Sequence, residues 1–193
     1  MNSKQTNELA LWDLQACVRT LPYRYMLREE DLYSELFPRE ILPLSESEID
    51  SLPQDLRNKL LAYALIDFLD YTTALEHTIV NPVFSAIGNS GLFSILREKH
   101  RIQALQFYTD EGYHAYFSYR LSAEASYLLD IPKIKRNPAR LELLSKIKSK
   151  NPNHRHSEII VCFLKTFVSE TLIAKELSRI SLTVNRKTSP RYA

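Results

Sequence analysis

The sequence predicts an all-α protein, and glycine content, helical periodicity and proline placement each support this class. Only 3 of the 193 residues are glycine, whereas sheet-rich proteins use glycine in their hairpin turns. Apolar residues recur at three- and four-residue spacing over long stretches, which is typical of amphipathic helices. Proline and the turn sequence Gly-Asn-Ser-Gly at residues 88–91 fall between these stretches.

The N-terminal part of the chain is expected to form one helix and an arm. Residues 8–21 have helical spacing, and Pro22 follows them directly. Residues 28–53 are acidic and interrupted by three prolines, so we expect an arm with short helical turns that wraps around the rest of the protein. Residues 1–53 are therefore assigned to this helix and arm.

The body of the protein is predicted to be a helical bundle over residues 54–184, followed by a polar tail at residues 185–193. Its first helix has Ser51 as predicted N-cap and is expected to kink or end at Asn81-Pro82. No internal repeat is present, so the bundle is expected to work as one domain. Further helices are predicted at residues 92–129, 139–148 and 157–181.

Composition restricts the classes of partner. The chain has 25 basic and 23 acidic residues, for a formal net charge of +2, so neither nucleic acid nor an anionic membrane is an expected partner. No apolar run reaches the length of a membrane helix, and the N-terminus is polar, so we expect a cytoplasmic protein. Cys17 and Cys162 are isolated and are expected to be reduced thiols.

Three carboxylates, Glu76, Glu111 and Glu170, interrupt apolar stripes at helical spacing. A buried carboxylate is costly unless it is paired or bound to a cation. One on each of three long helices suggests a shared positive centre, although Glu76 and Glu170 could instead pair with buried arginines. The stripes comprise Leu61, Leu65, Leu69, Thr72, Ile79 and Val83 around Glu76, then Ala104, Phe107, His114 and Ser118 around Glu111, and Ile160, Phe163, Phe167, Ala174 and Leu177 around Glu170.

Glu111 and His114 are three residues apart, so both project from one side of a helix and can reach one ion. Carboxylate oxygens together with imidazole suit iron or manganese. Ferritin-like four-helix bundles use a lone Glu on each of two helices and a Glu-x-x-His pair on each of the other two. The order lone Glu, Glu-x-x-His, lone Glu found here predicts an incomplete ferritin-like bundle.

Two segments carry a resemblance to a known family. Residues 75–83 contain Glu-His-Thr-Ile-Val-Asn-Pro-Val, and residues 108–118 contain Asp-Glu-Gly-Tyr-His-Ala-Tyr-Phe-Ser. In this order they resemble the p-aminobenzoate N-oxygenase family of di-iron proteins, over residues 56–182. The resemblance implies two iron ions (manganese is an alternative), dioxygen as co-substrate and oxidation of an arylamine nitrogen. Electrons would come from a donor of the ferredoxin or reductase type.

The resemblance also implies roles for individual residues. Glu76 would be the lone ligand of one half-site, Glu111 and His114 its pair, and Glu170 the lone carboxylate of the other half. Asp110 would orient a histidine ligand of that other half. The chain has no histidine after Glu170, so we expect a truncated piece, a split gene product or a partial site.

The function expected from these residues is di-iron oxygenation of a small-molecule amine, in secondary metabolism. The alternatives are a di-iron oxidase or desaturase-like enzyme that acts on carbon, and a metal-poor bundle that serves as a binding or scaffold partner. A bundle that lacks one ligand helix would expose apolar surface, so a homodimer is one expected assembly.

The remaining histidines and the tyrosines near the motif are expected to have structural roles. Gly112, inside the motif, costs helix stability of about 1 kcal/mol relative to alanine. His77 is expected at the surface, His100 in the core or at a helix end, and His154 and His156 in a solvated loop. The tyrosines are predicted to pack between helices, and one of them is an alternative candidate for lining a substrate channel: Tyr108, Tyr113, Tyr116 and Tyr119.

Overall fold

The computed structural model describes residues 11–14, 16, 18, 27, 35–42, 44–89, 96–132, 142, 161, 163–168 and 171. Every regular element within these residues is helical and none is a strand, so the predicted all-α class is confirmed. Several predicted features lie outside the described residues: Glu170, both cysteines, His154, His156, the polar tail and nearly all of the helix expected at residues 139–148.

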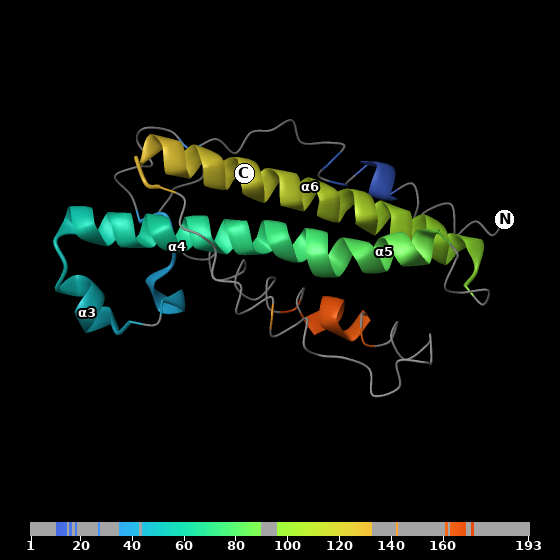
Figure 1. Cartoon of the computed structure of the whole chain (residues 1–193), viewed down its shortest axis with the longest axis horizontal. Helices are drawn as coiled ribbons and strands as arrows, with labels where there is room; N and C mark the ends of the chain where they lie inside the picture. Colours follow the sequence, from blue (N-terminus) through green and yellow to red (C-terminus); the bar gives the residue numbers. More distant parts are fainter. Residues whose placement is uncertain are drawn as a thin grey trace.

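Two long antiparallel helical rods dominate the structure (Figure 1). The first consists of α4 (Gln54–Leu75), η3 (Glu76–Val80) and α5 (Asn81–Gly88), which follow one another directly. The second is α6 (Glu98–Leu128), which runs back along both α4 and α5. Because the rods are antiparallel, the region around residue 76 lies opposite the middle of α6.

The first long helix does not end at Asn81-Pro82, and its distortion there is not a simple kink. It continues through α5 to Gly88, and the distortion takes the form of one wide π-helical segment, η3, immediately before Asn81. The following long helix begins at Glu98, later than the predicted residue 92.

The prediction that Ser51 caps the first long helix is wrong. Within the described residues 35–42 and 44–53, two short elements precede α4, namely η2 (Arg39–Ile41) and α3 (Glu46–Asp50). Ser51 ends α3 in helical backbone conformation and donates its hydroxyl to the carbonyl of Glu48 at 2.7 Å. The capping box is instead at α3, where the Ser45 and Glu48 side chains each bond the other's backbone N–H.

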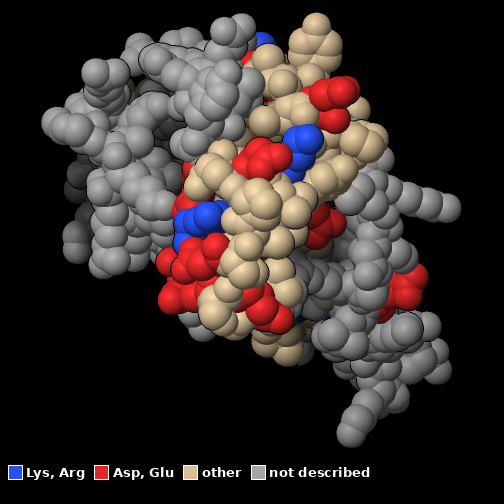
Figure 2. Space-filling view, turned by 90° about the vertical axis from the view of Figure 1, so that its left-hand side faces the viewer, with Lys and Arg blue, Asp and Glu red and all other residues tan. Residues whose placement is uncertain are grey.

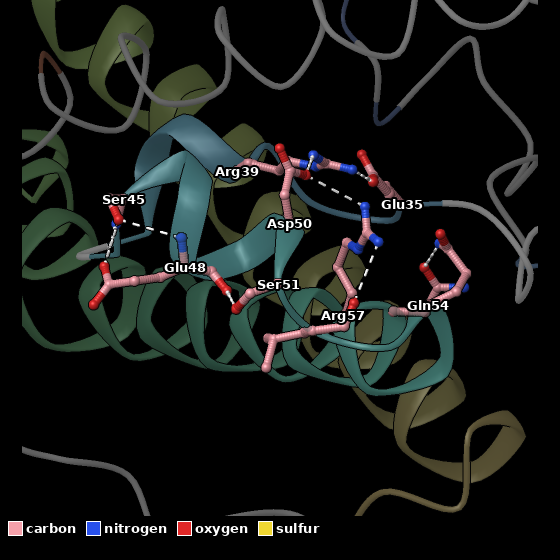
Figure 3. Close-up of polar contacts among 10 residues, drawn as sticks. Glu35, Arg39, Ser45, Glu48, Asp50, Ser51, Gln54 and Arg57 are labelled. Carbon is pink, nitrogen blue, oxygen red and sulfur yellow. Dashed lines mark hydrogen bonds and ion pairs between the residues drawn. The ribbon is translucent and has the colours of Figure 1, made fainter.

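Ion pairs tie the segment before α4 to the start of that helix (Figure 3). Arg39 pairs with Glu35 and, at 2.6 Å, with Asp50, which also lies 3.4 Å from Arg57. The hydrogen bond to Glu35 is the largest cause of the raised pKa of Arg39. Since the Asp50 side chain is 57% exposed, its pairs each contribute at most about 1 kcal/mol.

Apolar packing fixes the same segment more firmly. Phe37 is 4% exposed and lies against Phe68 of α4, with ring centroids 5.8 Å apart. It shares a core cluster with three leucines of α4, Leu61, Leu65 and Leu69. Burial of one such aromatic side chain contributes about 2 kcal/mol, more than the exposed ion pairs beside it.

This end of the molecule presents an acidic surface, on which red side chains surround smaller blue patches in Figure 2. Salt screens interactions on such a surface within about 10 Å at 0.1 M ionic strength. The ion pairs there are therefore expected to weaken in high salt. The exposed acidic residues of η2, α3 and the first turn of α4 are Glu40, Glu46, Glu48, Asp50 and Asp55.

The buried face of the first rod agrees with the predicted stripe. Leu61, Leu65, Leu69, Thr72, Glu76 and Val83 are buried and Ile79 is half-buried. The facing side of α6 is lined by small residues, and this lets the two helices approach closely. Two interhelical hydrogen bonds result, from Ser122 to Asp70 at 2.6 Å and from the Thr73 hydroxyl to the Ala115 carbonyl at 3.4 Å. The buried residues of α6 are Ala104, Glu111, Ala115, Ser118, Ser122 and Ala125.

Three predictions about packing are wrong. Phe107 is 52% exposed, because α6 buries its Ala/Ser side and leaves the large residues at the edges of the interface. Phe163 and Phe167 are also exposed, whereas their neighbour Thr166 is buried, so Thr166 and neither phenylalanine points inward there. Three of the four tyrosines expected between helices are exposed: Tyr108, Tyr116 and Tyr119. Among the described residues, no helix has the length and apolarity needed to cross a membrane.

Candidate metal site

Glu76, Glu111 and His114 come together between the two rods. Each offers one ligand atom, and these three atoms all lie within 4.8 Å of one another. Glu76 is the first residue of η3, whereas Glu111 and His114 are on successive turns in the middle of α6. The structure thus brings together three of the four residues expected as ligands, and their binding of metal remains a prediction.

The three side chains differ sharply in burial. Glu76 is 2% exposed and Glu111 is 7% exposed, whereas the His114 side chain is half-exposed. Leu75 and Val80, on either side of Glu76 in sequence, are fully buried and form an apolar cluster with Tyr71, Ile79 and Phe84. Two carboxylates in such surroundings are costly unless positive charge lies close to them.

Two residues of the group, Glu111 and His114, are in hydrogen-bond contact. Nδ1 of His114 lies 2.7 Å from Oε2 of Glu111. Two ligand atoms at right angles around one ion, each on a bond of about 2.1 Å, would be about 3 Å apart, so the observed separation needs little adjustment. With the buried Glu76 as third ligand, the group can hold an ion and leave coordination positions open. The residues therefore fit a divalent ion.

The backbone around Glu76 explains why this residue opens a π-helical segment. Pro82 has no N–H, and its ring would crowd the carbonyl of Thr78 in a regular α-helix. The wide turn relieves this crowding, and the N–H of Asn81 bonds the carbonyl of Glu76, five residues back. Hydroxyls of Thr72, Thr73 and Thr78 bond carbonyls four residues back, an arrangement that also bends helices.

The π-helical segment is a functional signal that the sequence analysis missed. Such segments occur often at functional sites, and here the segment begins at the most buried residue of the group. Asn81-Pro82 preceded by threonines is the sequence signal for this distortion, although the sequence predicts a kink or a helix end there. A second missed feature is the stack of Phe84 on Phe107, with ring centroids 5.1 Å apart, one helical turn before Glu111.

Asp110 contacts the N-terminal segment, and its role toward a histidine of the other half-site stays a prediction. Its Oδ2 atom accepts a hydrogen bond from the indole N–H of Trp12 at 2.6 Å. Its Oδ1 atom is buried and has no hydrogen-bond partner. Within the described residues, Asp110 thus holds the N-terminal segment and orients no histidine.

The other two described histidines do not join the group. His77 is exposed, as predicted, although it is next to Glu76 in sequence. His100 lies in the first turn of α6, as expected for a helix-end histidine, and its Nδ1 atom is buried without a hydrogen-bond partner. Glu170, the fourth expected ligand, is outside the described residues.

Comparison with protein-family models, with curated proteins and with solved structures gave no match to this chain.

Proposed function

We propose that the protein is a non-haem iron oxygenase that oxidises an amine nitrogen of a small molecule. The observation that carries the proposal is the convergence of Glu76, Glu111 and His114, with ligand atoms within 4.8 Å of one another. The choice of an arylamine as substrate comes from the resemblance of residues 75–83 and 108–118 to the p-aminobenzoate N-oxygenase family.

The protein residues have distinct tasks in this proposal. Glu76 and Glu111 supply two negative charges that balance a divalent ion, and their burial strengthens this attraction. His114 completes the ligand set from the solvent side, where its half-exposed ring leaves room for dioxygen and substrate to approach. Leu75 and Val80 keep water from the inner side. Bound iron would supply the activation of dioxygen.

The reaction needs electrons from outside the site. Insertion of one oxygen atom of O2 into an N–H bond sends the other oxygen to water, which consumes two electrons and two protons. None of the three ligand side chains is a source of two electrons, so an electron donor of the ferredoxin or reductase type is part of the proposal. A second iron would require Glu170 and further ligands. Glu76, Glu111 and His114 are therefore expected to hold one iron ion at most.

Metal binding can be tested with a matched pair of histidine variants. Ferrous iron is added anaerobically to wild type, His114→Ala and His77→Ala, and bound iron per chain is measured after desalting. We expect one iron ion for wild type and for His77→Ala and a large loss for His114→Ala. Equal iron content in all three would contradict the site, and a preference for manganese would change the metal but not the ligands.

The reaction is tested separately. The iron-loaded protein is given p-aminobenzoate, a chemical reductant and 18O-labelled dioxygen, and the product is analysed by mass spectrometry. Label on nitrogen supports the proposal, and label on carbon supports the alternative of a carbon-oxidising enzyme.

The contact between His114 and Glu111 also favours a second candidate, a metal-poor bundle that acts as a binding partner. In that case the pair would be a structural ion pair, and His114→Ala would lower stability in the presence of a chelator. If these residues instead bind metal, His114→Ala should lower stability mainly when iron is present.

A further inference from the structure

One side of α6 carries large side chains that remain exposed in the protomer. Leu105, Tyr108, Tyr116 and Tyr119 are between 44% and 57% exposed. At about 100° per residue, all four point within about 40° of the direction of Gly112. These four residues and Gly112 are called the tyrosine face below. Exposed apolar patches of this kind mark interaction sites more often than chance.

The tyrosine face is symmetric in sequence about Gly112. Tyr108 and Tyr116 lie four residues before and after it, and Leu105 and Tyr119 lie seven residues before and after it. A two-fold contact between identical chains requires a self-complementary surface, in which residue i meets residue j and j meets i. Two antiparallel copies of α6 that cross at Gly112 satisfy this condition, because Tyr108 then faces the partner's Tyr116.

Gly112 is unusual in a helix interior and is not required by packing within the protomer. A Cβ atom added to it would have nothing within 4 Å. Glycine lowers helix stability relative to alanine, and no contact that a Cβ would disturb among the described residues accounts for glycine at this position. At the crossing point of two helices a missing Cβ lets the axes approach to about 8 Å, the lower end of the usual range.

The exposed area suits a weak, reversible dimer. With about 200 Å² for each aromatic side chain, the tyrosine face and the adjoining Tyr127, which is 85% exposed, offer about 500 Å² per protomer. Two such faces would bury about 1,000 Å² in total, less than the standard of about 1,600 Å² and in the range of weak, reversible interfaces. Tyrosine is enriched in such interfaces, and the small net charge of +2 opposes self-association only weakly.

We propose that two copies of the chain form a two-fold dimer through the tyrosine face, with their α6 helices antiparallel and crossing at Gly112. His114 is two residues from Gly112 and therefore points about 200° around the helix. The dimer thus leaves the candidate metal site open. Success or failure of this proposal is independent of metal binding.

The first test is sedimentation equilibrium from nanomolar to submillimolar concentration, with helicity checked by circular dichroism. Wild type is expected to be a reversible dimer. Tyr108→Glu/Tyr116→Glu and Tyr108→Lys/Tyr116→Lys place like charges against each other and should each weaken the dimer at least about tenfold. A mixture of the two variants should restore it as a heterodimer. Leu56→Glu, at an equally exposed position on α4, is the control and should dimerise like wild type.

Two outcomes would overturn the proposal. Wild type that remains monomeric at every concentration excludes the dimer, and a mixture of Glu and Lys variants that stays monomeric excludes the pairing of Tyr108 with the partner's Tyr116. A monomeric wild type whose thermal stability falls in the Glu variant would show that the chain's own residues cover the tyrosine face.

The second test is disulfide trapping in a Cys17→Ser/Cys162→Ser background. Only residues at the two-fold axis lie close enough to their own copies for a disulfide, which needs a Cα separation of about 4.4 to 6.8 Å. Gly112→Cys is expected to give a disulfide-linked dimer on mild oxidation, whereas Leu56→Cys is not. Equal yields from both variants would point to random collision and contradict the crossing at Gly112.

Discussion

The indole of Trp12 donates a hydrogen bond of 2.6 Å to the carboxylate of Asp110, and this bond joins positions 98 residues apart. Asp110 directly precedes Glu111 on α6. The N-terminal segment is therefore attached to the helix that carries two of the three candidate ligands.

Replacing Trp12 with phenylalanine keeps most of the apolar area and removes the donor. The other Asp110 oxygen is already buried without a partner, so this carboxylate would lose its hydrogen bond inside the protein. We expect a loss of about 1–3 kcal/mol in the free energy of unfolding, measured by urea denaturation and circular dichroism. Asp110→Asn/Trp12→Phe should be less destabilised than Trp12→Phe, since the charge is then absent. The same cost in both variants would mean that packing of the indole matters more than its hydrogen bond.

Removal of the metal is expected to lower thermal stability. An ion that binds only the folded protein stabilises it by about 2.7 kcal/mol when its concentration is 100 times Kd. The melting temperature should therefore rise with added ferrous iron under anaerobic conditions and fall back with a chelator. An unchanged melting temperature over the whole titration would show that the folded protein has no specific ion site.

Glu111→Gln separates a metal site from a structural ion pair. Two buried carboxylates with ligand atoms within 4.8 Å repel each other in the metal-free protein, so neutralising one of them should raise the melting temperature of the apo form. The same change should lower iron affinity about tenfold or more, because amide oxygen carries no charge. Calorimetric titration and thermal melts of the same samples measure both effects. If the contact with His114 is mainly structural, the apo variant will instead melt at a lower temperature.

The capping box at α3 predicts a small acid-dependent loss of stability. Hydrogen bonds from the side chain and backbone of Ser45 lower the pKa of Glu48 below 4.5. A group whose pKa is lower in the folded than in the unfolded chain stabilises the fold above its unfolded pKa and loses this contribution as the pH falls through the folded pKa. Melting temperature should therefore decrease less steeply below pH 4.5 in Glu48→Gln than in wild type. Parallel curves would indicate that α3 frays without affecting the unfolding transition.

Gly112→Ala should have opposite effects on the protomer and on the dimer. Alanine in a helix interior is favoured by about 1 kcal/mol over glycine, and the added methyl group meets nothing in the protomer. The free energy of unfolding of the dilute monomer should thus increase. Dimer affinity should decrease several-fold, because the methyl groups collide at the crossing point. Sedimentation measures the dimer affinity, and denaturation at low concentration measures the free energy of unfolding of the monomer. Equal dimerisation of wild type and Gly112→Ala would argue against a crossing at Gly112.

The burial of Glu76 could be predicted from helical period, and its meeting with Glu111 could be predicted from helical period together with the order of the ligand helices. Leu61, Leu65 and Leu69 define the inward face, and Glu76 falls on its continuation. Glu111 and His114 are adjacent for the same reason, three residues apart on one helix. Local spacing determines which side chains share a face, and the chain order of the ligand helices determined which faces would meet.

The inward face of α6 could not be identified in this way. Its buried residues are mostly alanine and serine, which carry little hydrophobic signal, whereas the large residues Phe107, Tyr116 and Tyr119 are exposed. Close approach of the two rods selects small side chains, and only the tertiary structure shows this requirement. Ser51 failed as a cap for a related reason, because α3 occupies the residues that directly precede it.

The wide turn η3 has a consequence for how this chain tolerates insertions and deletions. A π-helical segment corresponds to one extra residue within an α-helix, and it takes up the rotation of about 100° that this residue would otherwise add. Loss of one residue between 76 and 80 should therefore restore regular α-helix and leave α5 turned toward α6 as before. Loss of a residue elsewhere in the rod would instead rotate Gly88, which is close enough to Leu105 that a Cβ there would lie 2.7 Å from it. A relative that builds the same Glu/Glu/His group on an uninterrupted α-helix should therefore have one residue fewer at this position.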